Sequence, residues 1–389
     1  MDSKSFSAID GIRGFAAVLV TLTHFVGAYA AIFRHIDLQQ ANFGNTPGFF
    51  DKILLWLFLN MHSLDILFVV SGFMVCRMVL RPSYPGLAGF LWARCMRIYP
   101  PLLVSLLFAV AMYSFASQPV SFDAWTITYN VLTLNGVFEL TGEKYNFPSW
   151  SMFYEVMYCL LIPALVALVN GRRRSVVAML MAWTVIMLVL AVAGFSGWFV
   201  FIPFAIGSLV ALVDDKLLAR LAKKMPAGVL VLVYLAASAL PATWAPIPIV
   251  NGGDFRLDPR YAIFVVLVCI SIALIVIKAA YEPCILQRIF SFRPLSHIGT
   301  ISYSIYLFHA PIIFMAFRYF PVPPAESWQA AGGIPHFALL LGTFWFATLI
   351  IAHIDFYAIE MLYFRSRLSS RSKASKARLQ AAPCPQPRY

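Results

Sequence analysis

The sequence predicts an all-α integral membrane protein that crosses the bilayer about ten times and keeps both termini in the cytoplasm. The first observation is composition: 61% of the 389 residues are hydrophobic and 12% are charged, and the mean hydropathy is +0.80. A soluble domain carries about 25% charged residues, so a large soluble core is excluded. The other two observations are the recurrence of long apolar segments and the distribution of Lys and Arg between the loops. We therefore expect a multi-pass protein of the plasma (inner) membrane.

The apolar segments are the expected spans, because a helix needs about 20 apolar residues to cross the hydrocarbon core. An additional apolar run, 124–140, is interrupted by Thr, Asn and Gly and is shorter than a span requires. We expect it to be an interfacial or re-entrant piece of the 117–149 loop. The predicted spans are 14–33, 55–76, 98–116, 150–169, 175–193, 198–213, 226–244, 261–279, 298–317 and 336–357.

The basic residues support this topology, because Lys and Arg are in excess on cytoplasmic loops. Counting 124–140 as a span would invert every later loop and put the basic triplet 172–174 outside. With 124–140 left out and both termini inside, six of the 29 Lys and Arg fall outside, namely Arg34, Lys52, Lys144, Arg256, Arg260 and Arg318.

The net charge of +12 follows from this topology, and membrane lipids rather than nucleic acid are the expected partners of the basic surface. Residues 1–360 are expected to form a single transmembrane domain. The basic segment 361–389, rich in Ser and Ala, is expected to be a disordered cytoplasmic tail. The six cysteines are scattered without zinc-binding spacing, so neither a metal site nor a disulfide framework is expected.

The first apolar span contains a histidine. If the segment is helical, His24 lies about 16 Å beyond Arg13, past the middle of a hydrocarbon core roughly 30 Å thick. A titratable side chain at that depth indicates a functional site. The alternative is a histidine that is simply bonded to a neighbouring helix.

Three more titratable side chains occur at comparable depth in other spans. Asp65 falls near mid-membrane in the second span, and His309 lies in the outer half of the ninth. Glu155 lies about 8 Å below Trp150 in the fourth span. A carboxylate at such depth needs a partner or a wet cavity. A structural Asp65 and an interfacial Glu155 that reaches water are the alternatives, but we expect all three to lie at the depth of His24.

Polar residues near these positions are candidates for substrate binding. Arg94 and Arg97 share one helix face, and guanidinium groups suit phosphate. The alternative for this pair is ordinary cytoplasmic enrichment of Arg. Ser71 lies on the second span and Tyr306 shares a stripe with His309, whereas Trp150 also suits an interfacial anchor.

The motifs DGIRG followed by His24, SLDILFVVSGF, RCMRIYP, SWSMFYE and ISYSIYLFHAP, in this order, resemble the acyltransferase-3 family of integral membrane O-acyltransferases. The resemblance covers about residues 7–360. It implies transfer of an acyl group, commonly acetyl, from a cytoplasmic coenzyme A thioester to a hydroxyl. The implied acceptors are sugars of surface polysaccharides, lipid-linked glycans or secreted small molecules, and no bound cofactor is implied.

The resemblance also implies roles for individual residues. His24 matches the essential histidine of the first helix, and Arg13 matches a conserved arginine. Arg94 and Arg97 match the pair implicated in donor binding. The conserved positions of less settled role are matched by Asp65, Ser71, Glu155 and His309. Two departures are Val156, where the family often has a second acid, and the expected lack of the extra C-terminal extracytoplasmic hydrolase-like domain.

The expected chemistry is general-base catalysis by His24, because histidine has the unperturbed pKa nearest neutrality. A carboxylate, Asp65 or Glu155, is expected to orient the imidazole. Direct transfer is the favoured hypothesis, and a covalent acyl-histidine intermediate is its alternative. The alternative function is a proton-coupled secondary transporter or flippase for a glycan or lipid, since such carriers also hold His, Asp and Glu in the membrane.

Overall fold

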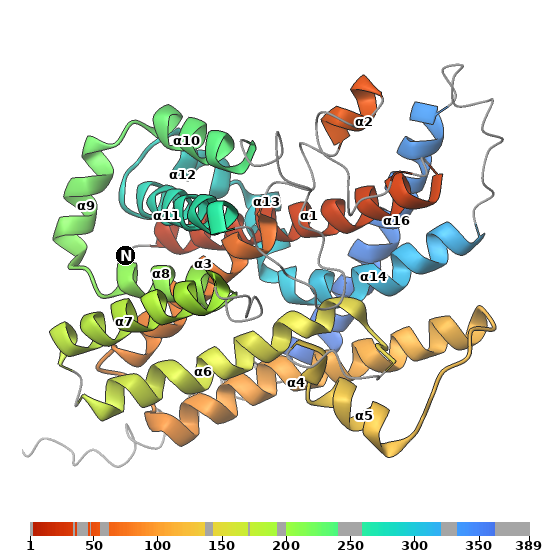
Figure 1. Ribbon diagram of the computed structural model, residues 1–389, viewed down its shortest axis with the longest axis horizontal. Helices are drawn as coiled ribbons and strands as arrows, with labels where there is room; N and C mark the ends of the chain where they lie inside the picture. The colour runs from red at the N-terminus through yellow and green to blue at the C-terminus, as the bar shows by residue number, and fades with distance from the viewer. Residues whose placement is uncertain are drawn as a thin grey trace, which may run out of the picture.

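The computed structural model describes residues 3–33, 36, 46, 48–54, 62–136, 143–169, 172–192, 200–239, 259–319 and 333–361. Within these ranges the chain is helical and contains no β-strand, as the composition predicts (Figure 1). The predicted tail lies almost entirely outside the described residues, as does the start of the second predicted span, 55–61.

The longer elements, in chain order, are α1 (Ser3–Phe33), α3 (Ser63–Val79), α4 (Gly86–Phe115), α6 (Trp150–Leu168), α7 (Arg173–Val192), α8 (Phe201–Ala211), α10 (Ala227–Ala239), α11 (Pro259–Tyr281), α14 (Ser302–Tyr319) and α16 (Gly333–Asp355). Shorter elements connect them: α2 (Phe49–Leu54), α5 (Ala124–Val131), η2 (Leu134–Gly136), η3 (Phe147–Ser149), α9 (Asp215–Lys224), α12 (Ile285–Phe290), α13 (Arg293–Thr300) and the π-helical turn η6 (Phe356–Glu360).

Several of these helices are long and apolar enough to cross a membrane. Among the described residues, six satisfy this by themselves, and up to eight spans result if each of two sharply bent helix pairs counts as one. The protein is therefore a polytopic all-α membrane protein. The number of ten spans and the cytoplasmic position of both termini stay predictions.

Several predicted spans differ from the helices that form. The first, 14–33, belongs to α1, which already begins at Ser3. The third, 98–116, belongs to a longer helix that begins at Gly86, so Arg94 and Arg97 lie within α4 rather than before it. The helix can continue through these arginines because their side chains face a polar cavity, which is described below, and not lipid. The ninth, 298–317, is not continuous, because α13 and α14 meet at Ile301 with a bend of 74°.

The bend follows from a close backbone contact between α13 and α1. A Cβ placed on Gly299 would lie 1.7 Å from the carbonyl oxygen of Asp10, and one on Gly14 would lie 2.2 Å from that of Leu295. Small residues allow helices in a membrane to approach this closely. As a result α13 crosses α1 at Gly14, and α14 then continues beside α1 (Figure 1). His309 of α14 meets His24 of α1 along this contact.

The run 124–140 was predicted not to be a span, and its described part does not form one long helix. It contains α5 and η2, and residues 137–140 lie outside the described part of the chain. Asp123 caps α5, and hydrogen bonds from the Thr126 hydroxyl and backbone amide lower the pKa of this exposed carboxyl to about 2. The amide of Asn146 donates to the carbonyl of Leu307 at 2.7 Å, so the end of the loop is fixed against α14.

Candidate functional site

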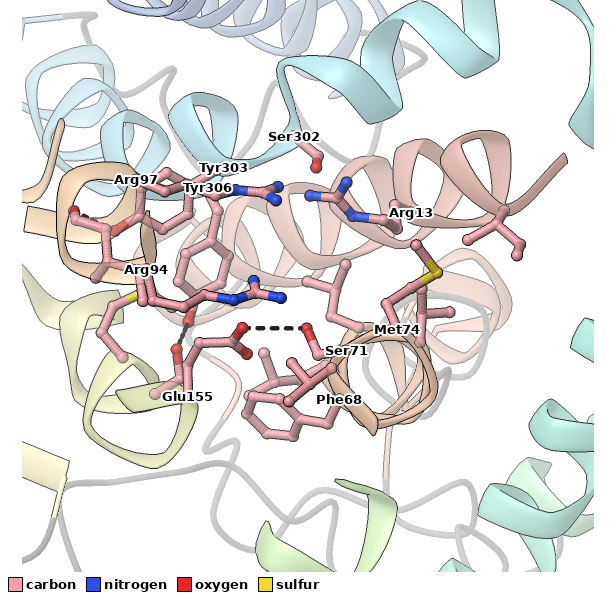
Figure 2. Close-up of a pocket in the computed structure, with 18 of the residues that line it drawn as sticks. Arg13, Phe68, Ser71, Met74, Arg94, Arg97, Glu155, Ser302, Tyr303 and Tyr306 are labelled. Carbon is pink, nitrogen blue, oxygen red and sulfur yellow. Dashed lines mark hydrogen bonds between the residues drawn. The ribbon is translucent and has the colours of Figure 1, made fainter. Parts of the chain in front are cut away.

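A cavity of about 140 Å³ lies between α1, α3, α4, α6 and α14. We call it the arginine cavity, because Arg13, Arg94 and Arg97 all point into it (Figure 2). Apolar side chains of α3, including Phe68 and Met74, form its opposite wall. Five helices from distant parts of the sequence are therefore needed to build it.

The three arginines come from two helices. Arg94 and Arg97 are one helical turn apart on α4, and Arg13 approaches from α1. The Arg13 guanidinium lies 3.6 Å from the carboxylate of Asp10, which also lines the cavity. In Figure 2 the Arg13 and Arg97 guanidinium groups point towards each other. Concentrated cationic donors of this kind suit a phosphate-bearing ligand.

Glu155 and Ser71 face the arginines from α6 and α3. The Ser71 hydroxyl donates to Glu155 Oε1 at 3.3 Å, and the carboxylate lies near Arg94 (Figure 2). The predicted site residues Arg13, Ser71, Arg94, Arg97 and Glu155 are thus brought together in one cavity.

Tyr306 connects the cavity to the start of α6. Its hydroxyl lies 2.7 Å from Ser151 Oγ and donates to the Pro148 carbonyl at 2.9 Å, while its ring lines the cavity. Trp150 is not among the residues that line the cavity, and it packs edge-on against Tyr154.

His24 and His309 form a hydrogen-bonded pair with nearly parallel rings. Nδ1 of His24 lies 2.6 Å from Nε2 of His309, and the two rings are 5.0 Å apart with an interplanar angle of 5°. His309 is completely buried. Its ring also lies 5.7 Å from the ring of Tyr306, so the pair adjoins the wall of the arginine cavity.

We expected a carboxylate to orient His24, but in the structure another histidine, His309, contacts its ring. Among the described residues, the hydrogen-bond partner of His24 is His309, and neither Asp65 nor Glu155 is. Asp65 lies on another face of α3 than the cavity-lining Leu64, and its carboxylate is 2.8 Å from Nδ1 of His62. The physical reason is helical rotation, because adjacent residues in a helix point about 100° apart.

Sequence reasoning missed one buried acid near the arginines. Glu360 lies in the π-helical turn η6, is 3% exposed and accepts a hydrogen bond from the Ser304 hydroxyl at 2.9 Å. It lies within electrostatic range of Arg97 and Arg13. The sequence shows it only as an acid three residues beyond the last predicted span, 336–357. The π-helical turn that holds it is visible only in the structure, and such turns are frequent at functional sites.

Comparison with known proteins identifies the family of the chain. The profile of the acyltransferase-3 family, described as an acyltransferase domain, matches residues 6–353. The peptidoglycan O-acetyltransferase OatA of Listeria monocytogenes serovar 1/2a (strain ATCC BAA-679 / EGD-e) is 26% identical over 92% of this chain and 55% of its own length, so the chain spans about half of that relative. No solved structure matches the chain. The family match covers most of the sequence, and the chain therefore belongs to the acyltransferase-3 family of membrane acyltransferases.

Proposed function

We propose that this protein moves an acyl group, most simply acetyl, from cytoplasmic acyl-CoA to a hydroxyl of a surface or lipid-linked glycan. The name of the Listeria relative supports acetyl as the transferred group and a glycan as the acceptor. The observation that carries the proposal is the separation of His24 from Arg13 along one helix. Membership of an acyltransferase family argues against the transporter predicted as the alternative.

The separation matches the length of the donor's flexible arm. Helix α1 runs without a break from Ser3 to Phe33, so His24 lies about 16 Å from Arg13. The pantetheine arm of coenzyme A has about as many backbone bonds as four peptide residues, which extend to roughly 14 Å. A donor whose pyrophosphate binds the arginine cavity therefore has its thioester near the histidine pair.

In the proposed reaction His24 is the general base and His309 is a positioning residue. If Nδ1–H of His24 donates to Nε2 of His309, the lone pair of His24 Nε2 is left for the substrate. This assignment of protons is part of the proposal, because the contact is compatible with either ring as the donor. His309 then does for His24 what the aspartate does in a serine-hydrolase triad, which is to hold one tautomer and orientation.

The bond changes follow from this geometry. The acceptor oxygen attacks the thioester carbonyl carbon as His24 Nε2 takes the hydroxyl proton. The carbon–sulfur bond then breaks, and the coenzyme A thiolate leaves and takes the proton from His24. The new ester bond forms between the acyl carbon and the acceptor oxygen, so atoms and charge balance without a cofactor.

The carboxylates near the arginine cavity keep the guanidinium groups compensated when no donor is bound. Asp10 pairs with Arg13, and Glu155 and Glu360 lie within electrostatic range of Arg97. Charges at this depth in a protein are tolerated only when compensated in this way. The donor's phosphates compete for the same arginines.

The test is acceptor-stimulated release of coenzyme A thiol from acetyl-CoA by purified protein in liposomes. Crude cell-envelope glycan serves as acceptor, and wild type is compared with His24→Ala. We expect release that requires acceptor and is lost in the variant. Release that persists in His24→Ala assigns the base elsewhere, and no release from any acyl-CoA by correctly folded wild type rejects the proposal.

Direct transfer has a separate test. The protein is mixed with radiolabelled acetyl-CoA without acceptor and quenched in acid. We expect no label on the polypeptide, whereas label on wild type that is missing from His24→Ala would replace direct transfer by an acyl-histidine intermediate.

A further inference from the structure

A second cavity, of about 420 Å³, lies at the C-terminal end of α3, where α3 approaches the starts of α7 and α9. Its basic lining residues are Arg77, Arg81 and Arg173. The same two turns of α3 also line the arginine cavity through Val75 and Met78. The two cavities are therefore neighbours that share one helix end.

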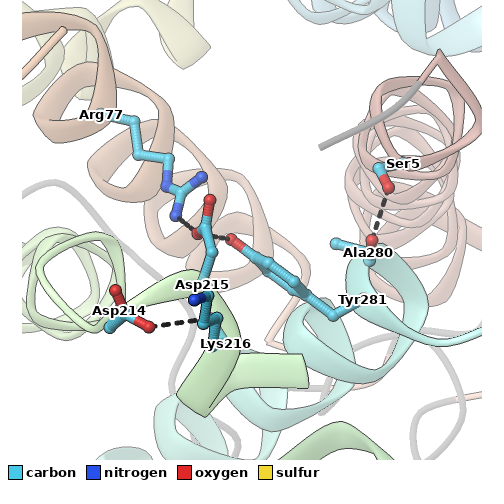
Figure 3. A network of polar contacts seen from close by, with 7 residues as sticks. All are labelled: Ser5, Arg77, Asp214, Asp215, Lys216, Ala280 and Tyr281. Carbon is cyan, nitrogen blue, oxygen red and sulfur yellow. Dashed lines mark hydrogen bonds and ion pairs between the residues drawn. The ribbon is translucent and has the colours of Figure 1, made fainter. Parts of the chain in front are cut away.

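A polar network holds one side of the second cavity in place (Figure 3). Arg77 forms an ion pair with Asp215, and the same carboxylate oxygen accepts a hydrogen bond from the Tyr281 hydroxyl at 2.8 Å. Asp214 accepts from the backbone amide of Lys216 at 2.9 Å and so caps α9. Both carboxylates at the cavity are thus engaged, and the charge of Arg77 is compensated by Asp215.

Arg81 and Arg173 differ from Arg77, because both are exposed and neither has a carboxylate partner among the described residues. The guanidinium of Arg81 lies 5.7 Å from the ring centre of Phe6. Phe6 precedes Arg13 by two turns on α1, which is about 10 Å along the helix axis. Arg81 therefore lies beyond the arginine cavity on the side away from His24.

Acyl-CoA carries a further phosphate group on the far side of its pyrophosphate. The pyrophosphate ends the pantetheine arm, and the 3′-phosphate lies on the other side of the ribose, further from the thioester. We propose that Arg81 and Arg173 bind this 3′-phosphate, which makes the second cavity the nucleotide end of the donor site. A phosphate monoester carries about −1.5 to −2 charges and accepts several hydrogen bonds, which two exposed guanidinium groups can supply. This inference rests on the proposed function.

Equilibrium binding of coenzyme A and of 3′-dephospho-coenzyme A to the purified full chain tests it, because the two ligands differ only in that phosphate. We expect wild type to bind coenzyme A about five- to tenfold more tightly, the range for a charge-assisted contact at a partly exposed site. In Arg81→Gln the Kd for coenzyme A should rise towards that of the dephospho form, and in the double variant Arg81→Gln/Arg173→Gln it should reach it, while the Kd of the dephospho form should not change. The matched control Lys223→Gln removes one positive charge from an exposed position on α9 outside the cavity and should keep the preference.

Equal Kd values for the two ligands in wild type, or an equal rise for both in Arg81→Gln, would overturn the inference while leaving the proposed function intact. Binding of neither ligand to folded wild type would reject both. The preference should also be the same in liposomes with and without anionic phospholipid. Its loss in anionic liposomes would mean that lipid headgroups occupy the cavity, and would overturn the inference.

Discussion

Nδ1 of His24 lies 2.6 Å from Nε2 of His309, which joins α1 and α14 by a hydrogen bond between two nearly parallel imidazole rings. The two residues are 285 positions apart in the sequence. The contact leaves Nε2 of His24 as the ring nitrogen that can meet a substrate, and it couples the protonation of one ring to the orientation of the other.

Replacement of His309 by alanine should slow the reaction without weakening donor binding. The variant loses the group that holds the tautomer of His24, and we expect kcat to fall about 10²- to 10⁴-fold with the Kd of coenzyme A unchanged. His309→Gln should recover part of kcat, because the glutamine oxygen can accept from Nδ1–H of His24. Equal activities of His309→Ala and wild type would contradict the positioning role.

Removal of the charge on Glu360 should lower the stability of the protein without ligand. It should also increase the stabilisation that the protein gains when its donor binds. Glu360→Gln keeps an acceptor for the Ser304 hydroxyl but leaves Arg97 less compensated. We expect a lower Tm without ligand, and a larger rise in Tm on addition of coenzyme A than in wild type. A smaller rise in Tm would show that Glu360 helps the donor to bind rather than competing with it.

Asp65→Asn separates a structural from a catalytic role for Asp65. The hydrogen bond with His62 and the position away from the arginine cavity lead us to expect a loss of about 1–2 kcal/mol in unfolding free energy. The fall in kcat should be much smaller than in His24→Ala. A fall as large as in His24→Ala, at unchanged Tm, would place Asp65 in the reaction instead.

The crossing of α1 and α13 should not tolerate a methyl group. Gly299→Ala would put a Cβ 1.7 Å from the carbonyl oxygen of Asp10, so the helices must separate at a cost of about 1–3 kcal/mol or more. Gly342→Ala is the matched control, because nothing lies within 4 Å of a Cβ there. Size-exclusion profiles after heating in detergent should show a lower Tm for the first variant only.

The cap of α5 should be lost only in strong acid. Hydrogen bonds, mainly from the Thr126 hydroxyl, lower the pKa of Asp123 from its usual value near 4 to about 2, so its stabilisation is present above pH 4 and disappears as pH falls through 2. Amide hydrogen exchange at the start of α5, corrected for intrinsic rates, should follow this curve. Asp123→Asn, also a good cap, should show no such pH dependence.

The class of the protein follows from the sequence alone. Long apolar segments and few charges are what a bilayer requires of a multi-pass helical protein. Several candidate site residues could also be recognised in the sequence. The five that line the arginine cavity were all predicted: Arg13, Ser71, Arg94, Arg97 and Glu155. A charged or polar group is costly within an apolar segment, and so it stands out there without knowledge of the fold.

The tertiary structure alone decided which of these residues meet. Depth in the membrane can be counted along a helix, but the rotation of each helix and the choice of its neighbours depend on packing between distant segments. For this reason His24 pairs with His309 rather than with Asp65, and Glu360 approaches Arg97 from the end of the last helix. The bend at Ile301 has the same origin, since it arises where glycines let the backbones of α1 and α13 touch.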